Sequence, residues 1–117
     1  MLEDKAREVG RLIGQSSEYQ AVKRANEGLN GDREAVALLQ RMEQIRLDAQ
    51  RMIEGGEQPT EQMERELDEL LGRVQSNAVY QRALVAQENF DKLMVQVNQW
   101  IMDGIKKGAT SSIITLG

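Results

Sequence analysis

The side chains best suited to chemistry are carboxylates that crowd one short stretch of the chain. Six of them lie between Glu57 and Glu69, and the only base among them is Arg65. Paired carboxylates can bind a divalent metal or transfer protons. The sequence offers no second element for such a site, such as an EF-hand loop, a histidine ligand or an apolar pocket. We therefore interpret the stretch as a solvated helix face, with its acids favourably placed near the helix N-terminus.

Two residue types that carry much of protein chemistry are absent from the sequence. The 117 residues include no cysteine and no histidine. This excludes disulfides, thiolate nucleophiles, Cys/His metal sites and histidine-centred proton relays. We expect no catalytic residue, no bound cofactor and no metal ligand, so the chain is predicted not to be an enzyme. An enzyme that uses carboxylates and a divalent metal remains an alternative.

The charge pattern disfavours a nucleic-acid partner. The net charge is −4, whereas nucleic-acid binders usually carry an excess of Lys and Arg. Arg41, Arg46 and Arg51 are five residues apart, a step of about 140° that spreads them around a helix. A nucleic-acid-associated module stays open as an alternative, and it would require a localised basic face.

The N-terminal residues and the hydropathy of the sequence indicate the localisation of the protein. Its first residues, Met-Leu-Glu-Asp-Lys, carry charges where a signal peptide needs an apolar segment. No run of residues approaches the ~18 apolar positions of a membrane span. We expect a soluble, cytoplasmic protein with no membrane insertion.

Hydrophobic periodicity predicts an all-α fold of five helices without strands. The two long helices are expected at about 33–54 and 77–107. Ser16 or Ser17, Asp32 and Thr60 are suited to cap helix starts, and Ser17 with Gln20 has the capping-box spacing. Because the breaks between helices are short, we expect antiparallel neighbours in a bundle-like arrangement. In it the two long helices form the spine, and the three shorter ones pack around them.

The helix predicted at 33–54 carries a regular apolar stripe. Its main positions step by three and four residues: Ala35, Leu38, Met42, Ile45, Ala49 and Met52. A methionine-rich stripe can form an adaptable groove for a partner. More often such a stripe is core or homodimer contact, which is the interpretation we favour for Leu38, Met42, Ile45 and Met52.

The last helix carries more apolar surface than one small domain can cover. A helix from 77 to 107 would be about 46 Å long at ~1.5 Å per residue. A compact domain of 100 residues is only ~26 Å across, from a radius of gyration of about 13 Å. We therefore predict a homo-oligomer, a dimer or larger, in which this helix supplies the main contact. The candidate interface or core positions are Phe90, Leu93, Met94, Val97, Trp100 and Ile101.

The C-terminal ten residues differ in character from the rest. After Gly108 strong helix formers give way to a Thr/Ser-rich segment with β character at Ile113-Ile114-Thr115-Leu116. We expect a single helical domain at 1–107 and a flexible tail at 108–117. Its apolar residues are predicted to touch the homo-oligomer or a partner.

A series of weak motifs occurs in an order typical of one known family. These are Ser17-Glu18-Tyr19-Gln20, Lys23, Ala25, Leu29 and Asp32, then Gly55-Gly56 and Pro59, then Asn77, Ala83, Ala86 and Asn98. Over roughly residues 2–107 the chain resembles the YlbF/YmcA family of small bacterial helical proteins. The specificity lies in the order and spacing of the motifs.

The resemblance implies a regulatory protein without enzymatic activity that forms homo-oligomers. Some members of the family influence RNA processing by an endoribonuclease and regulate development, and the best-studied ones hold iron–sulfur clusters through cysteines. This chain has no cysteine, so it looks more like an uncharacterised branch. The function we expect is a regulatory or adaptor role that depends on homo-oligomerisation and on binding a further protein. The alternatives are the nucleic-acid module and a structural protein with no ligand.

Overall fold

The computed structural model describes the backbone of residues 1–116 and the side chains of residues 1–110. The described chain is all-helical, as the sequence predicts. It contains α1 (Leu2–Gly14), α2 (Ser17–Asn30), α3 (Arg33–Glu54), α4 (Glu61–Gln75) and α5 (Ala78–Leu116).

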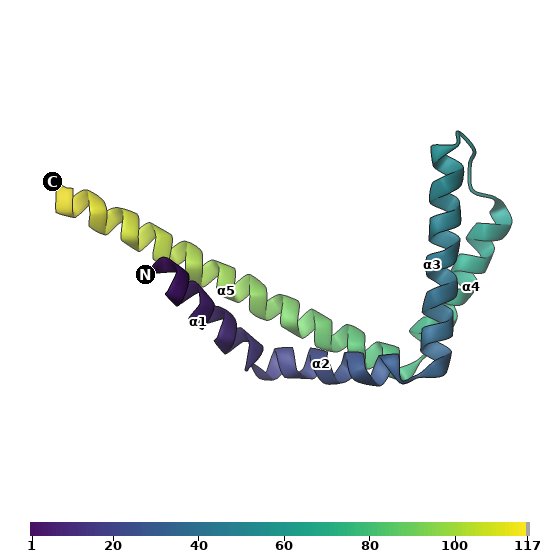
Figure 1. The fold of residues 1–117 in the computed structure, drawn as a ribbon, viewed down its shortest axis with the longest axis horizontal. Helices are drawn as coiled ribbons and strands as arrows, with labels where there is room; N and C mark the ends of the chain where they lie inside the picture. Colours follow the sequence, from purple (N-terminus) through teal and green to yellow (C-terminus); the bar gives the residue numbers. More distant parts are fainter. Residues whose placement is uncertain (117) are drawn as a thin grey trace.

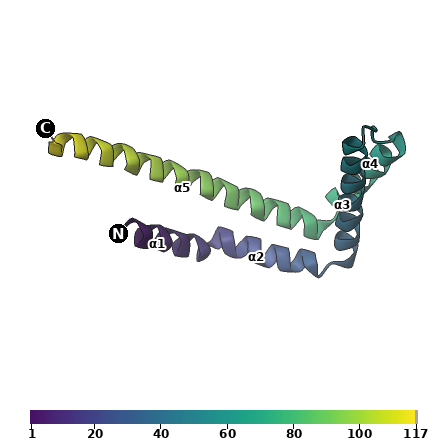
Figure 2. The same ribbon diagram turned by 45° about the horizontal axis from the view of Figure 1, so that its top comes forward.

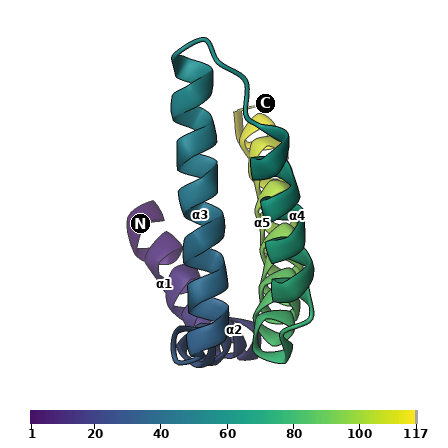
Figure 3. The same ribbon diagram turned by 90° about the vertical axis from the view of Figure 1, so that its right-hand side faces the viewer.

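The helices form two arms that meet at an elbow (Figure 1). In the first, which we call the long arm, α1 and α2 follow one another along one side of α5 (Figure 2). In the second, which we call the hairpin, α3 and α4 lie side by side (Figure 3). The N-terminus and the last turn of α5 both lie on the side of the long arm away from the elbow (Figure 1).

The chain is far more extended than a compact domain of its length. Its radius of gyration is 21.5 Å, whereas about 13 Å is expected for 117 residues. It measures 67 × 37 × 20 Å, and its helices pack in pairs in two separate arms, α2 with α5 and α3 with α4. Most domains instead pack at least two layers around one core.

The predicted bundle with α3 and α5 as its spine is wrong. The packed pairs are α2 with α5 and α3 with α4, and the two long helices lie in different arms. The reason lies in α4, which follows α3 after a short loop and presents Leu70 and Val74 to its stripe. Because α4 covers that stripe, α5 meets this cluster near its own start, through Tyr80.

The predicted helix starts are confirmed at Asp32 and Thr60, whose side-chain oxygens accept hydrogen bonds from the backbone N–H of Ala35 and Met63. The second helix is capped by Ser16, whose Oγ accepts from Tyr19 N at 3.1 Å. The expected capping box of Ser17 and Gln20 does not form, because Gln20 Nε2 donates to the carbonyl of Gly14 instead.

The last helix does not end near residue 107, because α5 continues through the predicted tail to Leu116. Glycine inside an exposed helix costs only ~1 kcal/mol, so Gly104 and Gly108 do not suffice to end it. The Thr110 hydroxyl also donates to the carbonyl of Lys106 at 2.9 Å, one turn back within the helix. Whether the tail's apolar side chains touch a partner falls outside the described side chains.

Candidate interaction surface

The two apolar stripes singled out in the sequence lie in different arms and in different surroundings. Leu38 and Ile45 are buried in the hairpin, where they form one cluster with Leu70 and Val74 of α4. Met42 is half-buried against that cluster, and Met52 is half-buried near the end of α3. Leu38, Met42 and Ile45 therefore face the interior of the chain's own hairpin.

The apolar stripe of α5 divides into a covered and an uncovered part. Near the elbow α2 covers it, and Ala86 is buried. Phe90 is half-buried and packs edge-to-face on Tyr19 of α2, with ring centroids 5.7 Å apart. Farther along, Leu93 and Met94 are half-buried and Val97 is buried.

Beyond Val97 the stripe is largely open to solvent. Trp100 is 58% exposed, and about half of the surface of Ile101 and Ile105 is exposed as well. A single exposed apolar residue is ordinary, but a contiguous series on one helix marks an interaction surface. The sequence predicted this excess on the last helix, and the structure locates it in the part farthest from the elbow.

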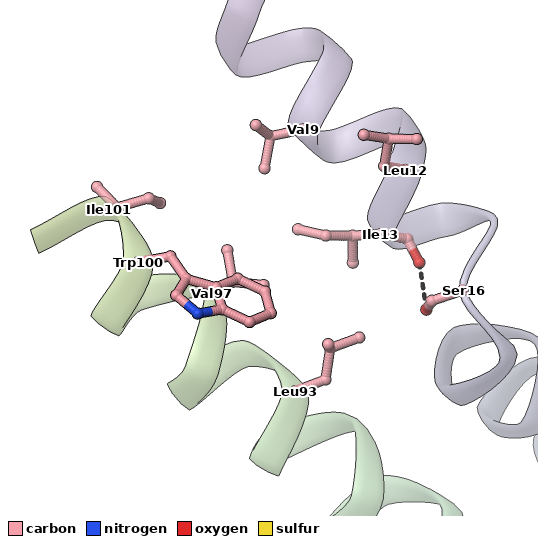
Figure 4. A pocket seen from close by; sticks show the side chains of 8 residues that line it. All are labelled: Val9, Leu12, Ile13, Ser16, Leu93, Val97, Trp100 and Ile101. Carbon is pink, nitrogen blue, oxygen red and sulfur yellow. Dashed lines mark hydrogen bonds between the residues drawn. The ribbon is translucent and has the colours of Figure 1, made fainter. Parts of the chain in front are cut away.

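An apolar groove of about 400 Å³ lies between α1 and this open part of α5 (Figure 4). We call it the α1–α5 groove. Its lining has a single polar side chain, Ser16, and no charged residue. The lining residues are Val9, Leu12, Ile13 and Ser16 from α1 and the corner that follows it, and Leu93, Val97, Trp100 and Ile101 from α5.

The corner between α1 and α2 fixes the direction in which α1 leaves the long arm. Ser16 Oγ donates to the carbonyl of Ile13 at 2.6 Å and accepts from Tyr19 N, so one hydroxyl joins both helices. Gln20 Nε2 adds a third side-chain hydrogen bond across the corner, to the carbonyl of Gly14 at 2.8 Å. These bonds hold α1 beside α5 without burying any residue of α1.

The arginines considered in the sequence as a basic strip, Arg41, Arg46 and Arg51 of α3, each lie close to an acid. Arg41 pairs with Glu66 of α4 at 2.7 Å, Arg46 with Glu43 at 3.4 Å and Arg51 with Asp48 at 3.9 Å. The Arg41 guanidinium makes two hydrogen bonds to the Glu66 carboxylate and lowers the pKa of that carboxyl. This ion pair links α3 to α4, so it has a structural role within the hairpin.

The acidic stretch from Glu57 to Glu69 lies along the loop before α4 and on α4 itself. Most of its carboxylates are exposed; Glu66 pairs with Arg41, and Glu61 lies 3.4 Å from Arg65. Among the side chains of residues 1–110, no three acids converge as a metal site would require. In the described part of the chain, no helix combines the length and apolar character that crossing a bilayer demands.

Comparison of the amino-acid sequence with known families identifies one that matches this chain. The profile of the family described as "Control of competence regulator ComK, YlbF/YmcA" matches residues 2–106, nearly the whole chain. The chain belongs to the YlbF/YmcA family. The matched segment includes both sides of the α1–α5 groove.

Several relatives within the YlbF/YmcA family are known only as UPF0342 proteins. One from Limosilactobacillus reuteri is 27% identical over 103 residues, which cover 88% of this chain and 84% of the relative. One from Leuconostoc citreum is 24% identical over 95 residues, covering 81% and 80%. One from Bacillus mycoides is 22% identical over 106 residues, covering 91% of each chain. The family is thus linked to regulation, while the names of these relatives assign no activity.

The α1 side of the groove was missed as part of a site in this YlbF/YmcA-family chain. Val9, Leu12 and Ile13 form one apolar face of a helix in which no residue is buried. The available signal was that face itself, on a helix too short to form a core alone. What the sequence could not supply is the angle of the corner at Ser16, which brings this face beside Trp100.

Proposed function

We propose that the chain is a non-enzymatic regulatory protein that forms a homo-oligomer through its long arm and acts by binding a further protein. The observation that carries the proposal is the excess of exposed surface. The chain exposes 9203 Å², whereas about 6,400 Å² is expected for a compact monomer of its mass. The excess of about 2,800 Å² exceeds the ~800 Å² per partner that a standard interface buries.

The character of this surface also supports protein binding. It includes Trp100, a residue type enriched at interfaces, beside aliphatic side chains and without charged residues in the groove. Arg41, Arg46 and Arg51 of α3 each pair with an acid, so these three arginines do not offer nucleic acid a comparable site. The family description, control of a competence regulator, is consistent with a role in regulation, which we extend to this chain.

Two differently tagged copies produced together in the native cells test both parts of the proposal. Capture of one tag should recover the other copy and at least one further protein in constant ratio. Recovery of neither would overturn the proposal. Recovery of nucleic acid in constant ratio, with a further protein present only until nuclease treatment, would move the function to the nucleic-acid module.

A further inference from the structure

The α1–α5 groove is built to stay open in the single chain. Closing it would require α1 to swing onto α5, which would break the hydrogen bonds that Ser16 and Gln20 make across the corner. Leu12, at 55% exposure, and Trp100, at 58%, therefore remain in water on opposite sides of the groove. An apolar surface held open in this way gains free energy when another apolar surface covers it.

A second copy of the chain is the occupant that best matches the surface. The long arm consists only of α1 and α2 along one side of α5, and a second long arm would add a further layer of helices. In a two-fold dimer the same patch serves both copies, so a single contact covers both grooves. The excess of about 2,800 Å², summed over both arms, is larger than the ~800 Å² per partner that a standard interface buries.

We infer that the α1–α5 groove is the binding site for the far end of a second copy's long arm, with Trp100 of each copy at the centre of the contact. The inference rests on the proposed homo-oligomer and adds α1 to it as half of the interface. In this arrangement α1 contributes Val9 and Leu12, which pack on the second copy.

The test compares substitutions on α1 with a matched substitution elsewhere. Leu12→Asp places a carboxylate in the groove and should weaken self-association by roughly a hundredfold or more, because the charge would be buried without a partner. Leu12→Ala, a milder change at an exposed position, should weaken it by about tenfold. Val95→Asp is the control, since Val95 is 70% exposed on the face of α5 opposite the groove.

The readouts are the mass from light scattering, the helicity from circular dichroism, and the emission of Trp100, the only tryptophan. The wild-type emission should shift to shorter wavelength as the oligomer forms, and Leu12→Asp should abolish that shift while Val95→Asp keeps it. If Leu12→Asp loses its helicity, the effect of Leu12→Ala on the mass and on the Trp100 emission tests the inference instead.

Three outcomes would overturn the inference. A wild-type monomer would remove the proposed homo-oligomer together with this binding site. A wild-type oligomer that Leu12 substitutions leave intact, or that Val95→Asp weakens equally, would leave the homo-oligomer standing and place its interface outside the groove. An oligomer in which Trp100 emission stays unchanged would leave the groove for another protein or an apolar ligand.

Discussion

Truncation of Trp100 is the substitution whose effect on assembly follows most directly from the structure. A tryptophan side chain presents about 250 Å² in full. With 58% of the residue exposed, about 145 Å² remains to be buried by a second copy. At ~25 cal/mol per Å² this burial contributes about 3.6 kcal/mol.

We therefore expect Trp100→Ala to weaken self-association substantially. Both copies lose the side chain, so the full loss is about 7 kcal/mol per dimer, or roughly 10⁵-fold in the Kd at 1.4 kcal/mol per factor of ten. Alanine retains part of the contact, and burial converts incompletely into affinity, so we expect about half of this free energy to be lost, or about 400-fold in the Kd. Sedimentation equilibrium over a range of concentrations measures the Kd directly.

The control for this prediction is Val95→Ala, on the opposite face of the same helix. Val95 is more exposed than Trp100, at 70%, so its truncation should leave both the fold and the Kd unchanged within about twofold. If Trp100→Ala leaves the Kd as it is, or if both variants change it alike, then α5 does not meet its partner through the groove.

Three further predictions concern the corner and the hairpin. Ser16→Ala should lower the free energy of unfolding by about 0.5–2 kcal/mol and weaken self-association, because it removes the hydrogen bonds at the corner. The control, Ser17→Ala, should change neither quantity. Equal effects of the two substitutions in denaturation and light scattering would show that Ser16 has no special role. Val74→Ala should lower the free energy of unfolding by about 1.5–3 kcal/mol, because Val74 is fully buried in the hairpin core. Leu71→Ala, on the more exposed side of α4, should lower it by less. The reverse order in urea titrations would contradict the hairpin core. Because Arg41 lowers the pKa of Glu66 in the folded state, the stability that Glu66 contributes is present above its usual value of 4.5 and is lost as the pH falls through the lowered pKa. Glu66→Gln should thus be less stable than the wild type near pH 7 and equally stable at low pH, and a difference that persists in acid would exclude this ion pair as its source.

The local structure could be predicted because each element is specified by nearby residues. The bounds expected for the third helix, 33–54, agree with Arg33–Glu54, since Asp32 caps its start and Gly55-Gly56 follows its end. Gly56 has a φ of 83°, a left-handed conformation that glycine adopts without strain. Such signals act over a few residues and do not depend on the rest of the fold.

The pairing of the helices could not be predicted in the same way. The stripes of α3 and α5 are both long and aliphatic, so periodicity alone does not determine which helix covers which stripe. The arrangement depends on the angles at the elbow and at the Ser16 corner, and these angles arise from a few hydrogen bonds at each break. The sequence therefore predicted an uncovered apolar surface on the last helix but not its second side on α1.

The central claim is that a second copy covers the exposed face of the long arm. Light scattering on the wild-type protein at micromolar concentration tests it most directly. A dimer or larger assembly should have a mass of at least twice the 13.2 kDa of one chain. A folded, helical species with the mass of a single chain would contradict it.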